Sequence, residues 1–426
     1  MDSTAFQVIA ILAIIAQGLL LFLALFEPTL RYKITHPPSH PLNSKEFENV
    51  LATLADSRSH FETTVEVLTN GEVYYEAELE AMRKATKSIN LEAYIFQKGE
   101  VTRRFLEVLT ERAKAGVKVN LVIDAIGSFT SWNSYFGELC NAGGRVAWYH
   151  GFKWHELPRL NSRTHREIIV VDCEVAFVGG AGFADHWLIS KKKRPRWRDT
   201  MFRVEGNAVS SVQSTFVENW LEASGELLTG NEYFCFPKKP SDATVLIVDS
   251  SVSSGMSTRA RMLFQTLLAS AKERIEITTP YFLPDKGVRD ELRRAIGERG
   301  VKVQIICPGS HADHLLTRRS SRRLYGSLLK AGAEIHEYQP SMIHTKSMVV
   351  DGVWSVVGST NLDHRSFSIN DEVNLASNDR GLAIRLREDF ARDLADSKQI
   401  SYQMWKNRPF LERIHESVGR ILERQQ

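Results

Sequence analysis

Two copies of one pattern constrain the fold of this chain more than any other feature of its sequence. The later copy places polar side chains in an otherwise apolar stretch: His344, Lys346, Asp351, Ser359 and Asn361. The earlier copy keeps the order and changes some of the residue types: His165, Glu167, Asp172, Gly180 and Gly182. Because buried polar groups are costly unless they are paired or used, the two copies predict two half-sites of one active site, at the seam between two similar lobes.

The segments around the two copies also repeat. Residues 88–96 and 116–124 are typical of strands joined by a helix, and residues 274–282 and 300–307 repeat this arrangement. Strand–helix–strand order with short connections favours an α/β fold. We expect two pseudo-symmetric α/β lobes at 62–240 and 241–405, each a mixed sheet flanked by helices. A basic helical tail is expected at 406–426.

Length and composition agree with two globular lobes. The chain has 426 residues, more than one ordinary core accommodates, with 43% apolar and 25% charged residues. A net charge of +3 gives no support to a nucleic-acid partner, and none is expected. The cysteines are scattered without metal-site spacing, which predicts free thiols in a reducing compartment. They are Cys140, Cys173, Cys235 and Cys307.

The first segment differs from the rest. Residues 6–26 carry no charge and are apolar except for Gln7, Gln17 and Gly18. As a helix rising about 1.5 Å per residue they could cross a bilayer. No basic residue precedes them, so a cleaved signal peptide is disfavoured. Arg31 and Lys33 follow them, which predicts a single-pass protein of the cell membrane with its catalytic body on the cytoplasmic side. Residues 1–33 are therefore expected to be an anchor and its flank, and residues 34–61 a linker.

The later copy has the chemistry of an anion site. Residues 344–350 and 353–357 are expected to form a hairpin around Asp351-Gly352. Residues two apart on a strand share a face, so the side chains of His344 and Lys346 should project together. An imidazole beside an ammonium suits a phosphate group. A core histidine beside a lysine is the alternative for this pair alone, and the full pattern with its second copy favours a site.

The pattern His-x-Lys-x4-Asp-x6-Gly-Ser-x-Asn at 344–361 resembles the signature of the phospholipase D superfamily. Residues of about 62–410 are similar to its bacterial cardiolipin synthase branch. Several further segments carry this likeness: Asn70-Gly71, 94–96, 160–163, 197–200, 279–282 and 361–372.

The resemblance implies phosphodiester exchange through a phosphohistidine, with no metal and no other cofactor. It makes His165 the nucleophile and His344 the general acid and base, roles that need different protonation states and so a bell-shaped pH profile. We expect Glu372 behind His344 and Asp199 behind His165, and we count Asp172 and Asp351 with the catalytic set. Phosphate would be bound by Lys346, Ser359 and Asn361.

The earlier copy departs from the family pattern, because Glu167 stands in place of the lysine and Gly182 in place of the final asparagine. An ionised Glu167 would repel a phosphate about 4 Å away by roughly 4 kcal/mol at an effective dielectric of 20. We therefore hypothesise that Arg163 or Arg198 replaces the lysine. The alternative is that the first half-site has decayed.

The resemblance thus favours a membrane-bound phosphatidyltransferase that converts two phosphatidylglycerol molecules into cardiolipin and glycerol. Its expected partners are this phospholipid and the membrane, and the sequence predicts no oligomeric state. A phospholipase D-type hydrolase acting on lipid, or with less support on nucleic acid, is the alternative, as is a catalytically weakened relative.

Overall fold

A computed structural model describes residues 3–25, 32–151, 161–191, 195–250, 258–409 and 412–413. Its strands form two sheets. The smaller sheet contains β2 (Thr63–Thr69), β3 (Ser88–Ala93), β4 (Lys118–Asp124), β5 (Arg145–Tyr149), β6 (Glu167–Val171), β7 (Val175–Gly179) and β8 (Thr200–Gly206). The larger contains β1 (Ser59–His60), β9 (Val245–Ser250), β10 (Arg274–Thr278), β11 (Lys302–Pro308), β12 (Glu334–Tyr338), β13 (Ser347–Val350), β14 (Trp354–Gly358), β15 (Glu372–Ser377) and β16 (Ser397–Ile400).

The strand orders reveal the duplication. The smaller sheet runs β2-β8-β7-β6-β3-β4-β5, and the larger repeats this order as β9-β15-β14-β13-β10-β11-β12, with β1 and β16 added at its edges. Neighbours among β3, β4 and β5 pair in parallel, as do those among β10, β11 and β12, while the other pairs are antiparallel. The predicted α/β class with two mixed sheets is confirmed.

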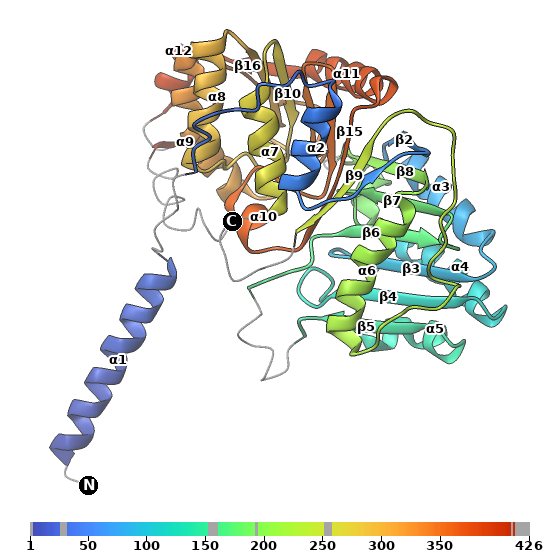
Figure 1. The fold of residues 1–426 in the computed structure, drawn as a ribbon. Helices are drawn as coiled ribbons and strands as arrows, with labels where there is room; N and C mark the ends of the chain where they lie inside the picture. Colours follow the sequence, from blue (N-terminus) through green and yellow to red (C-terminus); the bar gives the residue numbers. More distant parts are fainter. Residues whose placement is uncertain are drawn as a thin grey trace.

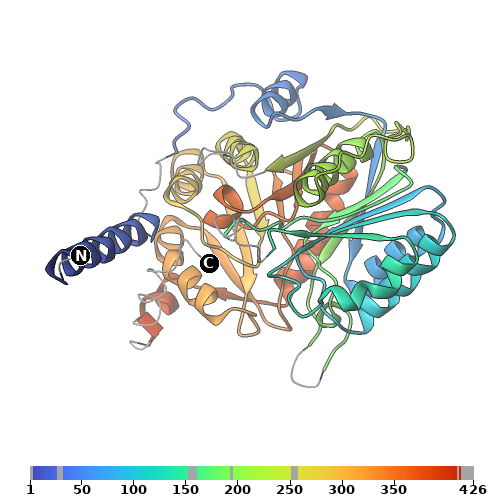
Figure 2. The same ribbon diagram turned by 90° about the horizontal axis from the view of Figure 1, so that it is seen from below.

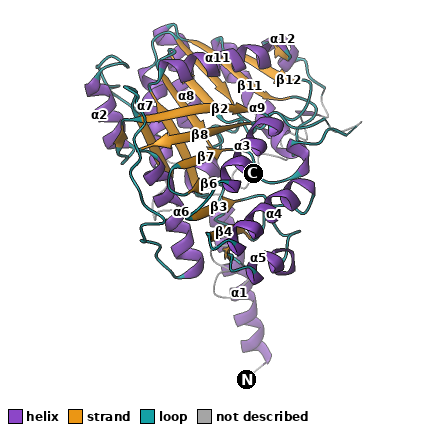
Figure 3. Cartoon of the chain, turned by 90° about the vertical axis from the view of Figure 1, so that its right-hand side faces the viewer, coloured by secondary structure: helices purple, strands orange, loops and turns teal. Residues whose placement is uncertain are grey.

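Helices cover the outer faces of the two sheets (Figure 1, Figure 3). On the smaller sheet they are α3 (Gly71–Arg83), α4 (Glu100–Lys114) and α5 (Gly137–Asn141). On the larger sheet they are α7 (Arg259–Ser270), α8 (Lys286–Arg299) and α9 (Leu315–Ala331). The remaining α-helices are α1 (Ser3–Leu25), α2 (Lys45–Leu54), α6 (Val209–Ser224), α10 (His364–Ser368), α11 (Arg380–Ala395) and α12 (Tyr402–Lys406).

The inner faces of the sheets pack against each other, as Figure 2 shows from below. Alternation along β6 explains this arrangement, since successive strand residues point to opposite faces. Ile169 and Val171 join the core under α3 and α4, whereas Ile168 and Val170 join a core shared with the larger sheet. That shared core also contains Val349 of β13. The duplication therefore brings equivalent strands of the two lobes together.

The predicted hairpin forms between β13 and β14. Asp351 and Gly352 have φ of 54° and 66°, a left-handed conformation that suits an Asp-Gly turn. The strand begins at Ser347, so His344 and Lys346 lie just before it and not within it as predicted.

The motif aspartates are placed differently from the prediction. The Asp351 carboxylate accepts hydrogen bonds from the backbone N–H groups of Lys272, Glu273 and Arg274 at 2.8, 2.9 and 2.7 Å. Asp172 does the same for residues 86–88 at 2.7, 2.7 and 2.9 Å. Each carboxylate thus holds the start of the neighbouring strand, at the far end of the hairpin strand from the histidine. Assigning Asp172 and Asp351 to the catalytic set was wrong, and their role is to fix the hairpin.

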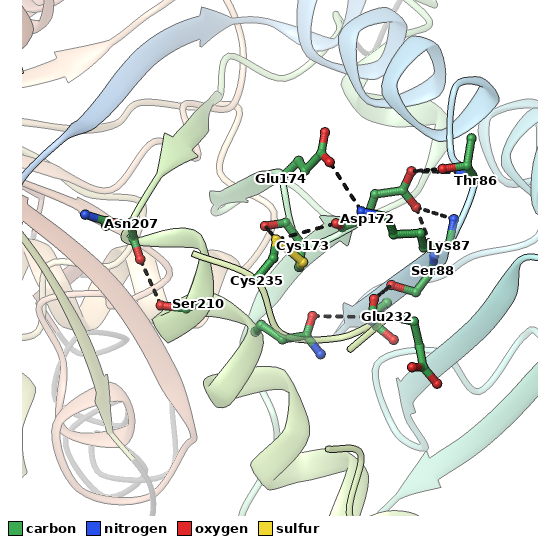
Figure 4. Close-up of a disulfide and its surroundings, with 12 residues drawn as sticks. Thr86, Lys87, Ser88, Asp172, Cys173, Glu174, Asn207, Ser210, Glu232 and Cys235 are labelled. Atoms are coloured by element: carbon green, nitrogen blue, oxygen red, sulfur yellow. Dashed lines mark hydrogen bonds and ion pairs between the residues drawn. A yellow bond between two sulfur atoms is a disulfide. The ribbon is translucent and has the colours of Figure 1, made fainter. Parts of the chain in front are cut away.

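The cysteine prediction was also wrong in part. Cys173 and Cys235, which are 62 positions apart in sequence, form a disulfide with a Cα–Cα distance of 5.6 Å (Figure 4). Cys140 and Cys307 are free. The segment after α6 runs past the β6–β7 turn, where the Ser88 hydroxyl also donates to the Glu232 carbonyl at 2.6 Å. Two cysteines so far apart in sequence form no short motif from which their pairing could have been predicted.

The predicted linker contains an ordered element. Ser44 caps α2 by accepting a hydrogen bond from the Phe47 backbone N–H at 3.1 Å. Phe47 and Leu51 are fully buried in the core of the larger lobe. Because these two residues are four apart, they lie on one face of α2 and make it apolar. Burial of this face stabilises the helix although proline and serine residues flank it.

Both ends of the chain leave predictions open. In the part of the chain that the structure describes, no helix was found to combine the length and apolarity needed to cross a membrane, so the predicted span stays a prediction. The basic tail predicted at 406–426 lies largely outside the described residues.

The role of Asp351 can be tested with Asp351→Asn. The amide loses the charge that three backbone donors share, and we expect the free energy of unfolding to fall by about 1–3 kcal/mol in urea denaturation. Asp242→Asn, at an exposed position, should leave stability unchanged. If Asp351→Asn is as stable as this control but has lost turnover, Asp351 belongs to the catalytic set after all.

Candidate active site

The two predicted half-sites meet at the seam between the lobes, because each histidine is held by the backbone of the other lobe. The His165 N–H donates to the Asp371 carbonyl at 2.9 Å, and the His344 N–H donates to the Arg198 carbonyl at 2.7 Å. These acceptors come immediately before Glu372 and Asp199 in the sequence. The same backbone contact in both lobes therefore places a carboxylate of one lobe beside the imidazole of the other.

The side chains also pair between the lobes, so that each histidine contacts a carboxylate of the other lobe. His165 Nδ1 lies 3.1 Å from both carboxylate oxygens of Glu372, and His344 Nδ1 lies 2.8 Å from Asp199 Oδ2. Both carboxylates are fully buried. The prediction had the opposite pairing, with Glu372 behind His344 and Asp199 behind His165. It was wrong because it kept each pair within one lobe.

Both histidines line one cavity of about 780 Å³. A carboxylate on Nδ1 favours the tautomer with its proton there, which leaves Nε2 available to a ligand. The Tyr94 ring lies 5.4 Å from the His165 ring, and the Trp197 ring lies 5.3 Å from the His344 ring. Further lining residues include Ile126, Asn161, Arg163, Glu167, Gly180, Tyr281, Leu315, Asn361, Asp363, Arg365 and Asn370. The cavity is thus a shared site with two imidazoles.

Lys346 sets the electrostatics of the second half-site. Its ammonium lies 2.9 Å from His344 Nδ1 and 3.0 Å from Nε2. Burial, followed by this neighbouring charge, lowers the pKa of His344. Burial also lowers the pKa of Lys346. Burial alone would raise the pKa of Asp199, but His344 and Lys346 outweigh it and the pKa is lowered. The pair therefore consists of a neutral imidazole against an ionised Asp199 at neutral pH.

The predicted phosphate-binding residues separate into two groups. Asn361 lines the cavity, and its buried Oδ1 has no hydrogen-bond partner among the described residues. The Ser359 hydroxyl instead donates to Glu372, so it positions that carboxylate and does not reach the cavity. The predicted phosphate contact for Ser359 was wrong, because the hydroxyl is used within the His165–Glu372 pair.

The two arginines proposed to replace the missing lysine also differ in position. Arg163 lines the cavity, where Nε lies 3.0 Å from Asp124 and Nη2 donates to the Tyr149 and His150 carbonyls at 3.1 and 3.0 Å. Arg198 does not line it.

The guanidinium of Arg198 lies 3.0 and 2.9 Å from the two carboxylate oxygens of Asp393 on α11. The hypothesis for Arg198 was wrong, because this residue ties the lobes together.

Sequence reasoning gave no role to several residues that build the site. Trp187 is fully buried and donates from Nε1 to Asp199 at 3.0 Å. Arg365 lines the cavity and donates to the Asn161 side chain and carbonyl at 2.9 and 2.7 Å. Burial raises the pKa of Asp363 to about 6. Arg365 and Asp363 follow the second motif, a position that could have indicated them, whereas nothing local indicated Trp187.

No group of three or more His, Cys, Asp or Glu side chains within the described ranges is placed to hold a metal ion. The chemistry available to these residues is nucleophilic attack, proton transfer and anion binding. A pair of imidazoles on carboxylates, with an ammonium beside one of them, suits transfer of a phosphoryl-type group.

Comparisons with known proteins agree with this geometry. Residues 79–194 and 264–394 match the family described as "Cardiolipin synthase, PLD-like domain". A cardiolipin synthase of Alkalihalophilus pseudofirmus is 34% identical over 368 residues, covering 85% of this chain and 72% of its own. The major cardiolipin synthase ClsA of Bacillus subtilis is 34% identical over 365 residues, covering 85% and 75%.

Among solved structures, a phosphatidylserine synthase of Haemophilus influenzae has a TM-score of 0.69 at 13% identity, covering 90% of this chain and 100% of its own. Polyphosphate kinase of Porphyromonas gingivalis has a TM-score of 0.54 at 11% identity, covering 92% and 56%. These two likenesses concern the fold alone. From the family match and the similarity to curated relatives over most of its length, the chain belongs to the cardiolipin synthase family of phospholipase D-like proteins.

Proposed function

We propose that this protein is a phosphatidyltransferase that makes cardiolipin from two phosphatidylglycerol molecules and releases glycerol. The observation that carries the proposal is the pair of cross-lobe contacts, His165–Glu372 and His344–Asp199, at one cavity. Membership of the cardiolipin synthase family supports the substrate and the product.

In the first half of the reaction, His165 Nε2 attacks the phosphorus of one phosphatidylglycerol. The P–N bond forms as the P–O bond to the terminal glycerol breaks, and a proton from His344 Nε2 neutralises the leaving alkoxide. Glu372 stabilises the positive imidazole of His165. We expect Asn361, which lines the cavity, and Lys346, whose ammonium lies 3.0 Å from His344 Nε2, to bind the phosphoryl oxygens, whose charge increases in the transition state.

In the second half, the terminal hydroxyl of another phosphatidylglycerol enters. His344, now neutral, takes its proton, and the oxygen attacks phosphorus as the P–N bond breaks. Cardiolipin forms and His165 is regenerated. Water in place of this alcohol would give phosphatidic acid, so hydrolysis and transfer differ only in the acceptor.

The rim of the cavity supports a lipid substrate. Ile126 and Leu315 line the cavity from opposite lobes, with 38% and 56% of their surfaces exposed. Phe129 and Trp132 lie on the loop after β4 and are 59% and 62% exposed. Exposed apolar side chains beside a site suit a lipid surface better than a polyanion. This favours phospholipid over nucleic acid.

We also infer that residues 1–33 anchor the protein in the cell membrane, with the catalytic body on the cytoplasmic side. The uncharged apolar segment at 6–26 and the basic residues after it support this placement. The Cys173–Cys235 disulfide opposes it, because disulfides persist mainly in oxidising compartments.

The reaction can be tested with purified protein and vesicles of labelled phosphatidylglycerol. We expect cardiolipin and glycerol in equal amounts, and His344→Ala should lower the rate by at least about 1,000-fold because the proton donor and acceptor is lost. Product masses distinguish the outcomes. If the products are phosphatidic acid and free glycerol without cardiolipin, the protein is a hydrolase and not a transferase.

The pH dependence tests the role of His344. As general acid it must be protonated in the free enzyme, and burial lowers its pKa below the usual 6.5. We therefore expect kcat/KM to fall as pH rises through a midpoint below 6.5. In kcat this limb should lie at higher pH, because a bound anionic phosphate stabilises the imidazolium. A kcat/KM that instead rises through this midpoint would make His344 the nucleophile.

The membrane side can be tested through Cys140, which is free and exposed. In intact cells a membrane-impermeant maleimide should leave Cys140 unlabelled, and permeabilisation should allow labelling. Cys140→Ser controls for reaction at other thiols. Labelling of Cys140 in intact cells would place the body outside the membrane.

A further inference from the structure

The three departures in the first copy lie together in space. A Cβ atom on Gly182 would be 2.9 Å from Glu167 Oε1, and one on Gly180 would be 2.7 Å from Cδ and 2.8 Å from Nζ of Lys346. The family pattern has asparagine and serine at these two positions. Here the missing side chains leave space for Glu167 and for the lysine of the other lobe. The absence of side chains at Gly180 and Gly182 is therefore matched to the positions of Lys346 and Glu167.

The two oxygens of Glu167 have different surroundings. Oε1 accepts hydrogen bonds from the backbone N–H groups of Tyr94 and Ile95 at 3.2 and 3.3 Å. Oε2 is buried and has no hydrogen-bond partner among the described residues. The side chain is only 4% exposed and lines the cavity beside His165. With Oε1 occupied as the acceptor, Oε2 is the oxygen that can carry a proton and donate it to a ligand.

The charges that face Glu167 agree with a neutral group. Burial raises the pKa of its carboxyl well above the ordinary value. Lys346 of the other lobe acts in the opposite direction, and Glu92 on β3 adds to the increase. The first half-site then presents no negative charge to a phosphate, which removes the repulsion expected from the sequence. The Lys346 ammonium lies beside His344, 3.0 Å from its Nε2.

We propose that Glu167 is a neutral carboxylic acid that donates a hydrogen bond from Oε2 to a non-bridging phosphoryl oxygen of the substrate. It would act at the position where the family pattern has a lysine. The identity of the substrate rests on the proposed function, whereas the protonation of Glu167 does not. A buried donor of this kind binds the phosphoryl oxygen without placing a second ammonium beside Lys346.

Two substitutions separate hydrogen-bond donation from charge. Glu167→Gln keeps a neutral donor, and its kcat on phosphatidylglycerol vesicles should stay within about three-fold of wild type. Glu167→Met has similar size and no donor, and its kcat should fall at least about ten-fold. Equal melting temperatures would exclude misfolding. Full activity in Glu167→Met, or an equal loss in both variants, would overturn the proposal.

Glu167→Lys restores the residue of the family pattern. We expect its turnover to fall, because a second ammonium would lie near Lys346 in a site already shaped around the first. A rise in turnover would mean that the first half-site had merely lost its lysine, and the proposal would fail. Throughout, His344→Ala reports whether the measured turnover belongs to this site.

A readout without lipid separates this proposal from the function. The infrared difference spectrum between wild type and Glu167→Gln at pH 7 should contain the carbonyl stretch of a protonated carboxyl group. Its absence would show Glu167 to be ionised, whatever the activity. If the band is present but the protein does not consume phosphatidylglycerol, Glu167 is protonated as proposed and the proposed lipid reaction is wrong.

Discussion

The rest of the site depends on two contacts between the lobes, in which each lobe supplies the carboxylate that binds the other lobe's histidine. Each imidazole lies against a fully buried carboxylate of the other lobe, and each contact is accompanied by a backbone hydrogen bond between the same segments. Removing the imidazole from such a pair leaves a buried carboxylate without its hydrogen-bond donor, which costs about 1–3 kcal/mol or more. Neither lobe alone could therefore hold its histidine in the orientation that the chemistry needs. Lobe association and assembly of the site are one event.

The core shared by the two sheets explains how the two histidine–carboxylate pairs are held in position. Ile168 and Val170 on β6 pack in the same cluster as Val349 on β13, and these strands start just after the two histidines. Arg198 adds a second tie across the seam through Asp393. Because well-packed interfaces deform little, small movements of one lobe would displace both imidazoles together. Apolar packing and an ion pair outside the cavity thus help to set the positions of the catalytic groups.

The sequence predicted what is periodic and local. The repeated strand–helix–strand pattern indicated two α/β lobes, and the Asp351-Gly352 pair indicated the hairpin, since both depend on neighbouring residues. The pairing of His344 with Asp199 could not be predicted, because it depends on which lobe edges meet. The position of Asp351 was misjudged for a related reason, since its three backbone partners lie at 272–274, far away in sequence. The Cys173–Cys235 disulfide and the Trp187–Asp199 contact were missed because they too are long-range.

The exchange between lobes also explains why the first copy could change without losing its histidine. In a site where each copy served its own imidazole, substitutions in the first motif would alter the surroundings of His165 directly. Here the partner of His165 is Glu372, which is held by Ser359 of the intact second motif. Glu167, Gly180 and Gly182 thus take no part in the contact between His165 and Glu372. Each imidazole depends on a carboxylate of the other lobe, so divergence in one copy is tolerated only where it spares the carboxylate that the other copy needs.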